Sequence, residues 1–322
     1  MDRPFVLDAG LSAIAIGYKN PSAAYVADKV LPREQVTQEK FKWTLYPIEE
    51  GFNVPDARVS RKGRVQQLEF GGTEQTSSVE DFGLDAPIPY SDIDAAAKAR
   101  AAGTSNFDPE GRAVMMLTDA MLNQREVRVA GMVQNAANYS AGRKTTLAGN
   151  AQFSDYANSD PIGRISAGCD ATLVFRPTIG VMGRAVWSIV NKHPKVVNAV
   201  KGNVTDSGII TLAQWTELFR DEGIQEWIIG DSFYNTAKPG QVANVQRAWG
   251  KHISLLHVNP NATPESGGIT FGLTAQYGNR IAGRIEDKDI GLQGGVRIRS
   301  GERVKELIVA PDVGYFIQNA VA

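Results

Sequence analysis

The longest regular pattern of apolar and polar positions predicts a helix from about residue 108 to 138. Its start, Asp108-Pro109-Glu110, supplies an N-cap, a proline at the first helical position and an acidic side chain near the positive end of the helix dipole. Apolar side chains recur on one face at Met116, Ala120, Val127 and Ala130, widened by Leu117 and Met121. Polar residues 123–126 interrupt any heptad repeat, so the pattern favours a single long helix over a coiled coil.

The part of the chain before this helix is extended in pattern and poor in apolar side chains. FKWTLYPI, residues 41–48, alternates large apolar with polar residues, and RVQQLEF, residues 64–70, does so loosely. We predict a hairpin-like loop over 37–90, which needs another surface to lie on because an isolated two-stranded ribbon is marginally stable in water. Residues 1–36, interrupted by three prolines, are predicted to form an arm with a short helix over 22–30.

Strand and helix patterns alternate beyond the long helix. TIGVMG (178–183), EWIIGDSFYNTA and KHISLLHVN are predicted strands, and TLAQWTELFRDEG is a predicted helix capped by Thr211 and stopped by Gly223. The alternation favours a compact α/β or α+β domain from about 176 to 265. Before it lie a short strand candidate, 144–147, and a helix that starts at Asp160-Pro161.

The end of the chain is again strand-like. GGVRIRSGERVKELIV predicts a hairpin, with Val296–Arg299 and Val304–Val309 as its strands and Ser300-Gly301 as its turn. A final apolar strand, 313–321, follows Pro311. Because chain ends fray unless they are tied down, this strand needs a partner that is built much earlier in the chain.

Composition narrows the classes of function. The 322 residues are 43% hydrophobic and 21% charged, which is typical of an ordinary soluble protein with two domains. A net charge of −1 gives no overall attraction for nucleic acid or an anionic membrane, and no apolar run approaches a membrane span. The single cysteine, Cys169, is expected to be a buried structural thiol.

The residues that usually carry chemistry do not assemble into a recognisable site. The three histidines lack metal-ligand spacing, and no G-x-S-x-G stretch is present. We therefore predict no catalytic residues, no cofactor site and no metal site. Four cations gather around Gly63 in the predicted loop, and we interpret them either as solvated surface or as a contact with acidic surface of another subunit: Arg58, Arg61, Lys62 and Arg64.

Three stretches in this order resemble the major capsid protein of tailed bacteriophages, whose fold is shared with encapsulins. They are AAYVADKVLPREQVTQEKFKWTLY (23–46), PTIGVMGRAVWSIVNKHPKV (177–196) and the ending VKELIVAPDVGYFIQNAV. The resemblance implies an α+β fold with an N-terminal arm (1–36), an extended loop (37–90), a peripheral domain (91–175 and 266–322) around the long spine helix, and an inserted axial domain (176–265). It also implies that residues 313–321 pair beside strands of the spine domain.

The resemblance implies a structural, non-enzymatic function. Such proteins self-assemble as pentamers and hexamers into an icosahedral shell around a double-stranded DNA genome. The implied partners are the chain itself, portal and scaffolding proteins, a decoration protein, and packaged DNA bound non-specifically, with no membrane. The implied location is the virion capsid, assembled in the host bacterial cytoplasm. Two alternatives stay open: an encapsulin-type shell that houses cargo, and an α/β enzyme with its site within 176–265.

Overall fold

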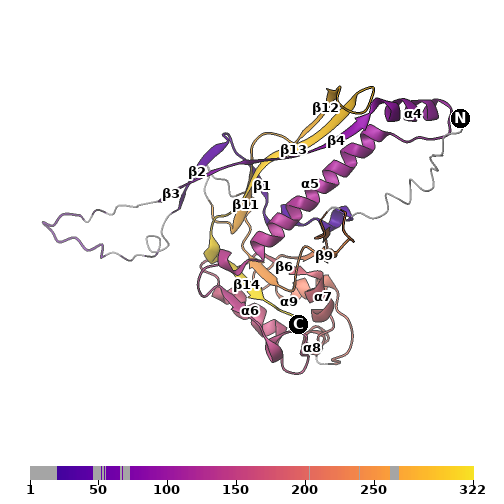
Figure 1. The fold of residues 1–322 in the computed structure, drawn as a ribbon. Helices are drawn as coiled ribbons and strands as arrows, with labels where there is room; N and C mark the ends of the chain where they lie inside the picture. Colours follow the sequence, from indigo (N-terminus) through magenta and orange to yellow (C-terminus); the bar gives the residue numbers. More distant parts are fainter. Residues whose placement is uncertain are drawn as a thin grey trace.

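The computed structural model describes residues 20–45, 52, 54, 56–65, 67, 73–202, 204–238, 240–261 and 268–322. The predicted α+β class is confirmed: a long twisted sheet with a helix along it leads into a second sheet surrounded by short helices (Figure 1). The region 46–48 of the predicted first loop strand, and most of 64–70, lie outside the described residues.

The long sheet is built around one continuous strand, β13 (Gly295–Ile308). One edge of β13 pairs with β4 (Glu80–Pro89). The other edge pairs first with β12 (Ile281–Asp287) and then with β11 (Gly272–Gln276), which continues to the parallel strand β1 (Arg33–Gln35).

The predicted hairpin within this region is wrong, because Ser300 and Gly301 continue the strand instead of turning it. Ser300 lies opposite Leu84 on one side and Ala282 on the other, so the ladder is paired through the predicted turn. A Cβ atom at Gly301 would lie 2.9 Å from the carbonyl oxygen of Phe82. The glycine therefore permits close approach of the neighbouring backbone.

The predicted long helix is α5 (Pro109–Val133), preceded by α4 (Tyr90–Ala101). Asp108 caps α5 as expected, since its side chain accepts a hydrogen bond from the backbone N–H of Glu110. The helix ends before residue 138, and Ala136–Asn138 form the 3-10 turn η2.

The buried face of α5 matches the predicted one in part. Leu117, Met121 and Ala130 are buried as predicted, whereas Met116 and Ala120 are exposed. Ala113 and Leu117 pack against apolar side chains of β4 and β13. The sequence pattern assumed one neighbour along the whole helix. In the structure, the first half of α5 covers the long sheet and the second half meets the arm and the second sheet.

The second sheet has the strand order β5-β14-β10-β6-β7. Its strands are β5 (Lys144–Thr146), β14 (Gly314–Gln318), β10 (Ile253–Leu256), β6 (Ile179–Gly183) and β7 (Glu226–Gly230). The helices that follow or precede these strands are α6 (Pro161–Ala171), α7 (Arg184–Val190), α8 (Pro194–Val200) and α9 (Leu212–Leu218).

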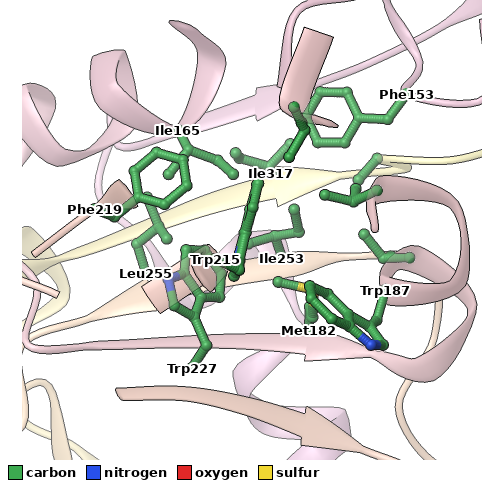
Figure 2. Close-up of a cluster of buried hydrophobic side chains, with 14 of the residues drawn as sticks. Phe153, Ile165, Met182, Trp187, Trp215, Phe219, Trp227, Ile253, Leu255 and Ile317 are labelled. Carbon is green, nitrogen blue, oxygen red and sulfur yellow. The ribbon is translucent and has the colours of Figure 1, made fainter. Parts of the chain in front are cut away.

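A core rich in tryptophan fills the space between this sheet and its helices (Figure 2). The Trp215 ring is fully buried, with its centroid 4.7 Å from that of Phe219 and 5.4 Å from that of Trp227. Thr211 and Gln214 form a capping box that fixes the start of α9 and thus the position of Trp215.

The predicted pairing of the terminal strand is correct for one of its two neighbours. β14 pairs with β5, which belongs to the predicted peripheral segment 91–175. Its other neighbour is β10 of the predicted inserted domain, so β14 lies in the second sheet and not in the long sheet along α5. Phe316 and Ile317 are fully buried there, one on each face, so the strand is apolar because both of its faces are covered.

The arm and the loop complete the described chain. The predicted arm helix is split into η1 (Ser22–Ala24) and α2 (Ala27–Val30). The base of the loop is an antiparallel ribbon of β2 (Lys40–Leu45) and β3 (Thr73–Ser78). The remaining short elements are η3 (Gly149–Ala151), η4 (Pro311–Val313), β8 (Phe233–Asn235) and β9 (Val245–Arg247).

Candidate subunit-contact surface

The four predicted contact residues lie together in the connection between β2 and β3, far from the second sheet (Figure 1). Arg58, Arg61, Lys62 and Arg64 are all exposed. The turn that gathers them is local, because the N–H of Gly63 donates to the carbonyl oxygen of Ser60 at 2.9 Å. Their side chains form no ion pair with any carboxylate in the described ranges.

Exposed apolar side chains flank these cations. Val65 is 74% exposed and Val54 is 95% exposed, and Val59 and Phe52 are also exposed. We refer to the described residues 52–65 with these eight side chains as the loop tip. A surface that combines cations with large exposed apolar groups is typical of a contact with another molecule.

The base of the loop is anchored to the long sheet, in contrast to its tip. Phe41 is buried beside Leu273 and Ala275 of β11, and its ring stacks on Trp43 with centroids 5.9 Å apart. Lys42 on β2 forms an ion pair with Glu74 on β3. The protein therefore presents the loop tip from a fixed base.

Among the described residues, one buried histidine–serine contact has the residue types of a catalytic pair. Ser159 Oγ lies 3.0 Å from His193 Nε2, and both side chains are buried. The backbone N–H of Lys195 donates to His193 Nδ1, so the ring proton sits on Nε2 and is donated to the serine oxygen. Ser159 in turn donates to the carbonyl oxygen of Asp155. Because a general base must face the hydroxyl with an unprotonated nitrogen, this arrangement caps α8 and does not activate a nucleophile.

The single cysteine is explained by packing. Burial raises the pKa of the Cys169 thiol to about 12, which makes it unreactive. In the described part of the chain, no three His, Cys, Asp or Glu side chains converge on a position that could hold a metal ion. No helix there is long and apolar enough to cross a membrane.

The structure also contains a buried charged cluster that the sequence pattern did not reveal. Glu126 is fully buried, and its carboxylate accepts hydrogen bonds from the backbone N–H groups of Val26 and Ala27 and from Trp249 Nε1, at 2.6 to 3.1 Å. Burial raises the pKa of this carboxyl above its usual range. The carboxylate fixes the arm to α5 at the start of α2.

The neighbouring Arg125 completes this cluster. Its guanidinium pairs with Asp28 of the arm and donates to the carbonyl oxygen of Leu31 and to Thr274 Oγ1 of β11. Burial alone would raise the pKa of Asp28. The adjacent guanidinium groups of Arg125 and Arg33 outweigh this effect and hold the pKa below its usual range. The sequence shows this buried cluster only as an Arg-Glu pair within the apolar pattern of the predicted helix. The sequence pattern identifies that pair as an interruption of a heptad repeat and gives no sign of its burial.

The chain is similar in sequence and in fold to known phage proteins. No protein-family model matches the chain. The chain is 44% identical over 321 residues to the major capsid protein of Pseudomonas phage JBD67, covering 100% of this chain and 99% of that one. A solved phage-related protein from Bordetella bronchiseptica RB50 is 22% identical, with a TM-score of 0.69 and 98% of each chain covered. The capsid of cyanophage P-SCSP1u is 9% identical, with a TM-score of 0.60, covering 99% of this chain and 91% of that one.

The chain belongs to the family of phage major capsid proteins. It has a structural role: it associates with copies of itself to form the capsid shell of the virion. An encapsulin complex from Synechococcus elongatus PCC 7942 matches with a TM-score of 0.52 at 10% identity over 98% of this chain and 96% of that one. This likeness concerns the fold alone, so the phage relatives favour the capsid over a cargo-housing shell.

Proposed function

We propose that the loop tip contacts a neighbouring subunit in a closed icosahedral shell of pentamers and hexamers that encloses a double-stranded DNA genome. The observation that carries the proposal is the exposed group of four cations with adjoining apolar side chains on an anchored base. Like charges repel, and a free tip gains nothing from holding them together. Carboxylates of a neighbour would remove this repulsion and fix the loop.

We further propose how the chain divides into domains. Residues 1–36 act as an arm, 37–90 as the extended loop, and 91–175 with 266–322 as a peripheral domain. The inserted domain, 176–265, faces the axis of each pentamer and hexamer. β14 pairs with β5 of the peripheral domain on one side and with β10 of the inserted domain on the other, which supports a close connection between the two domains at this strand.

The remaining partners follow from the capsid role. We propose a portal protein, a scaffolding protein and a decoration protein as partners, with assembly in the host bacterial cytoplasm. Packaged DNA is contacted without sequence preference, because a net charge of −1 provides no strong overall attraction. We propose that the protein carries out no catalysis, in line with the tautomer of His193.

The proposal is tested by changing all four cations to glutamine and following shell formation across a salt series. We expect the free subunit to melt as the unchanged protein does, since the four side chains are exposed. Shell yield should fall and become more sensitive to salt, because fewer ion pairs remain to withstand screening. A variant with lysine at Arg58, Arg61 and Arg64 retains the charge and should assemble normally. Unchanged yield of the glutamine variant at every salt concentration would contradict the proposed contact.

A further inference from the structure

Strand β12 is an outer strand of the long sheet, and one of its edges is unpaired (Figure 1). It forms a ladder with β13, and its backbone makes no hydrogen bond to any other described stretch of backbone. Residues 281–286 of the strand are all exposed. A free edge of this length offers N–H and C=O groups to a strand of another chain.

The strand on the opposite side of β13 has a protected edge. β4 contains Pro87 and Pro89, which cannot donate a backbone hydrogen bond, and prolines of this kind are typical of edges that stay unpaired. β12 contains no proline, and its register with β13 is unbroken from Ile281 to Asp287. Of these two strands, β12 is therefore the one suited to accept a partner.

Two large apolar side chains of β12 face away from the rest of the subunit. Ile281 is 49% exposed and Ile285 is 40% exposed. Ile285 lies opposite Arg297 in the ladder, whereas α5 packs against the neighbouring residues Val296 and Ile298. Since successive side chains of a strand point to opposite faces, the two isoleucines lie on the face that α5 does not cover.

The strand is complementary to itself in one register. Gly283 lies midway between the two isoleucines, and a Cβ atom at this position would meet nothing within 4 Å. If two copies pair antiparallel about a two-fold axis at Gly283, Ile281 comes to lie opposite Ile285 of the partner subunit, and Ile285 opposite Ile281 of the partner subunit. An axis one residue further on would place Arg284 opposite Arg284 of the partner subunit, and like charges directly opposite each other are destabilising.

We propose that β12 pairs antiparallel with β12 of a second copy, centred on Gly283, so that the two long sheets become continuous. The partner is a second copy because the strand matches itself in this register and because the protein associates with copies of itself. Residues 281–285 of each copy form a small contact, so it is stable only together with the other contacts of an assembly.

The symmetry of this contact limits where it can lie. A two-fold contact cannot join neighbours in a ring of five, so it joins subunits of different pentamers and hexamers. This placement rests on the proposed function, whereas the strand pairing itself does not.

A single engineered cysteine tests the pairing in the full-length chain. Directly opposite residues of antiparallel strands have Cα atoms about 4.5–5.5 Å apart, which is within the range of about 4.4–6.8 Å that a disulfide spans. Gly283→Cys particles that are oxidised mildly should therefore contain mostly disulfide-linked dimers, which reductant converts to single chains. Background reaction is small because Cys169 is buried and its thiol has a pKa of about 12.

The matched control is Ile281→Cys on the same strand. In the proposed register, residue 281 lies four residues from residue 281 of the partner subunit, a distance of about 13 Å, so this variant should not form the bond. Particles assembled from a mixture of Ile281→Cys and Ile285→Cys subunits should form it. No bond at Gly283→Cys, or dimers from Ile281→Cys alone, would overturn the proposal.

This test separates the strand pairing from the proposed loop-tip contact. The loop tip is unchanged in these variants, so shells that form without the Gly283→Cys bond overturn the strand pairing alone. If the protein forms oligomers other than closed shells, the bond should still form in them, and the proposed function alone would then be wrong.

Shell yield provides a second readout without new cysteines. Ile285→Asp should lower the yield several-fold, because it places two carboxylates beside apolar side chains at the contact, while the free subunit melts as the unchanged protein does. Leu84→Asp on β4 is the control, since Leu84 is also 40% exposed on the same sheet, and it should assemble normally. Unchanged yield of Ile285→Asp, or an equal loss from Leu84→Asp, would overturn the proposal.

Discussion

The second sheet and the loop tip differ in how much each is stabilised by packing within its own subunit. Every residue of β10 is buried, and the sheet encloses a core that includes Trp187, Trp215 and Trp227. Residues 56–65 of the loop tip are all exposed and hold only local turn contacts among the described residues. The comparison teaches that one part of this sequence encodes its own packing, whereas the other leaves its side chains exposed, as the proposed contact with a neighbouring subunit requires.

The largest expected effect comes from the core side of this comparison. Trp215→Ala should lower the free energy of unfolding by about 3–5 kcal/mol, because it removes a fully buried aromatic ring and leaves a cavity. Val65→Ala in the loop tip should change it by no more than about 0.5 kcal/mol, because that side chain contacts mainly solvent. Chemical denaturation of the free subunits measures both. Similar losses from the two variants would remove the distinction between the regions.

The sequence predicted those features whose causes are local. The caps Asp108 and Thr211 were identified because each side chain bonds to a backbone N–H only two or three residues away. The cluster of four cations in the loop tip is likewise visible in a single stretch of sequence.

The features that the sequence did not predict depend on neighbours far along the chain. Strand β13 passes through a serine-glycine pair because strands on both sides pair with it there. β14 finds its partner in β10, about sixty residues away, through a register that no local pattern specifies. Glu126 is buried because the arm, about one hundred residues earlier, supplies N–H donors to its carboxylate.

The arm is intermediate between the apolar core and the exposed loop tip, because a buried polar contact with Glu126 holds it in place. Glu126→Gln should cost about 1–3 kcal/mol of stability, since the amide group leaves one of the buried N–H donors of Val26, Ala27 or Trp249 unsatisfied. Thermal melting of the free subunit measures this cost. No loss of stability would show that the carboxylate does not hold the arm.

The stability cost of Glu126→Gln should depend on pH, and the direction of this dependence follows from the pKa of Glu126. The pKa of Glu126 is raised in the folded state, so the folded protein holds this proton more tightly than the unfolded chain does. Its contribution to stability therefore decreases as pH rises from the carboxyl's ordinary value of 4.5 to the raised one. The glutamine variant lacks this decrease. The difference in unfolding free energy between the unchanged protein and the variant should therefore become smaller as pH rises. If this difference in stability does not change with pH, Glu126 does not titrate with a raised pKa in the folded protein.

The smallest effect is expected from a surface ion pair within the subunit. Arg299 on β13 makes two hydrogen bonds of 2.8 Å to Asp85 on β4, and this contact lowers the pKa of Asp85. Arg299→Gln should cost about 0.2–1 kcal/mol, a contribution present above the carboxyl's ordinary pKa and lost as pH falls through the lowered one. Shell yield should stay unchanged, in contrast to the loop-tip variant. A large drop in yield would mean that cations outside the loop tip also join subunits.

Hydrogen exchange measured on the free subunit and on assembled shells tests the central claim most directly. Amides of β6 (Ile179–Gly183) should exchange slowly in both states, because their strand is paired on both sides and buried within the subunit. Amides of residues 56–65 should exchange fast in the free subunit and become strongly protected in the shell. Equal exchange of residues 56–65 in the two states would contradict the claim that neighbouring subunits order the loop tip.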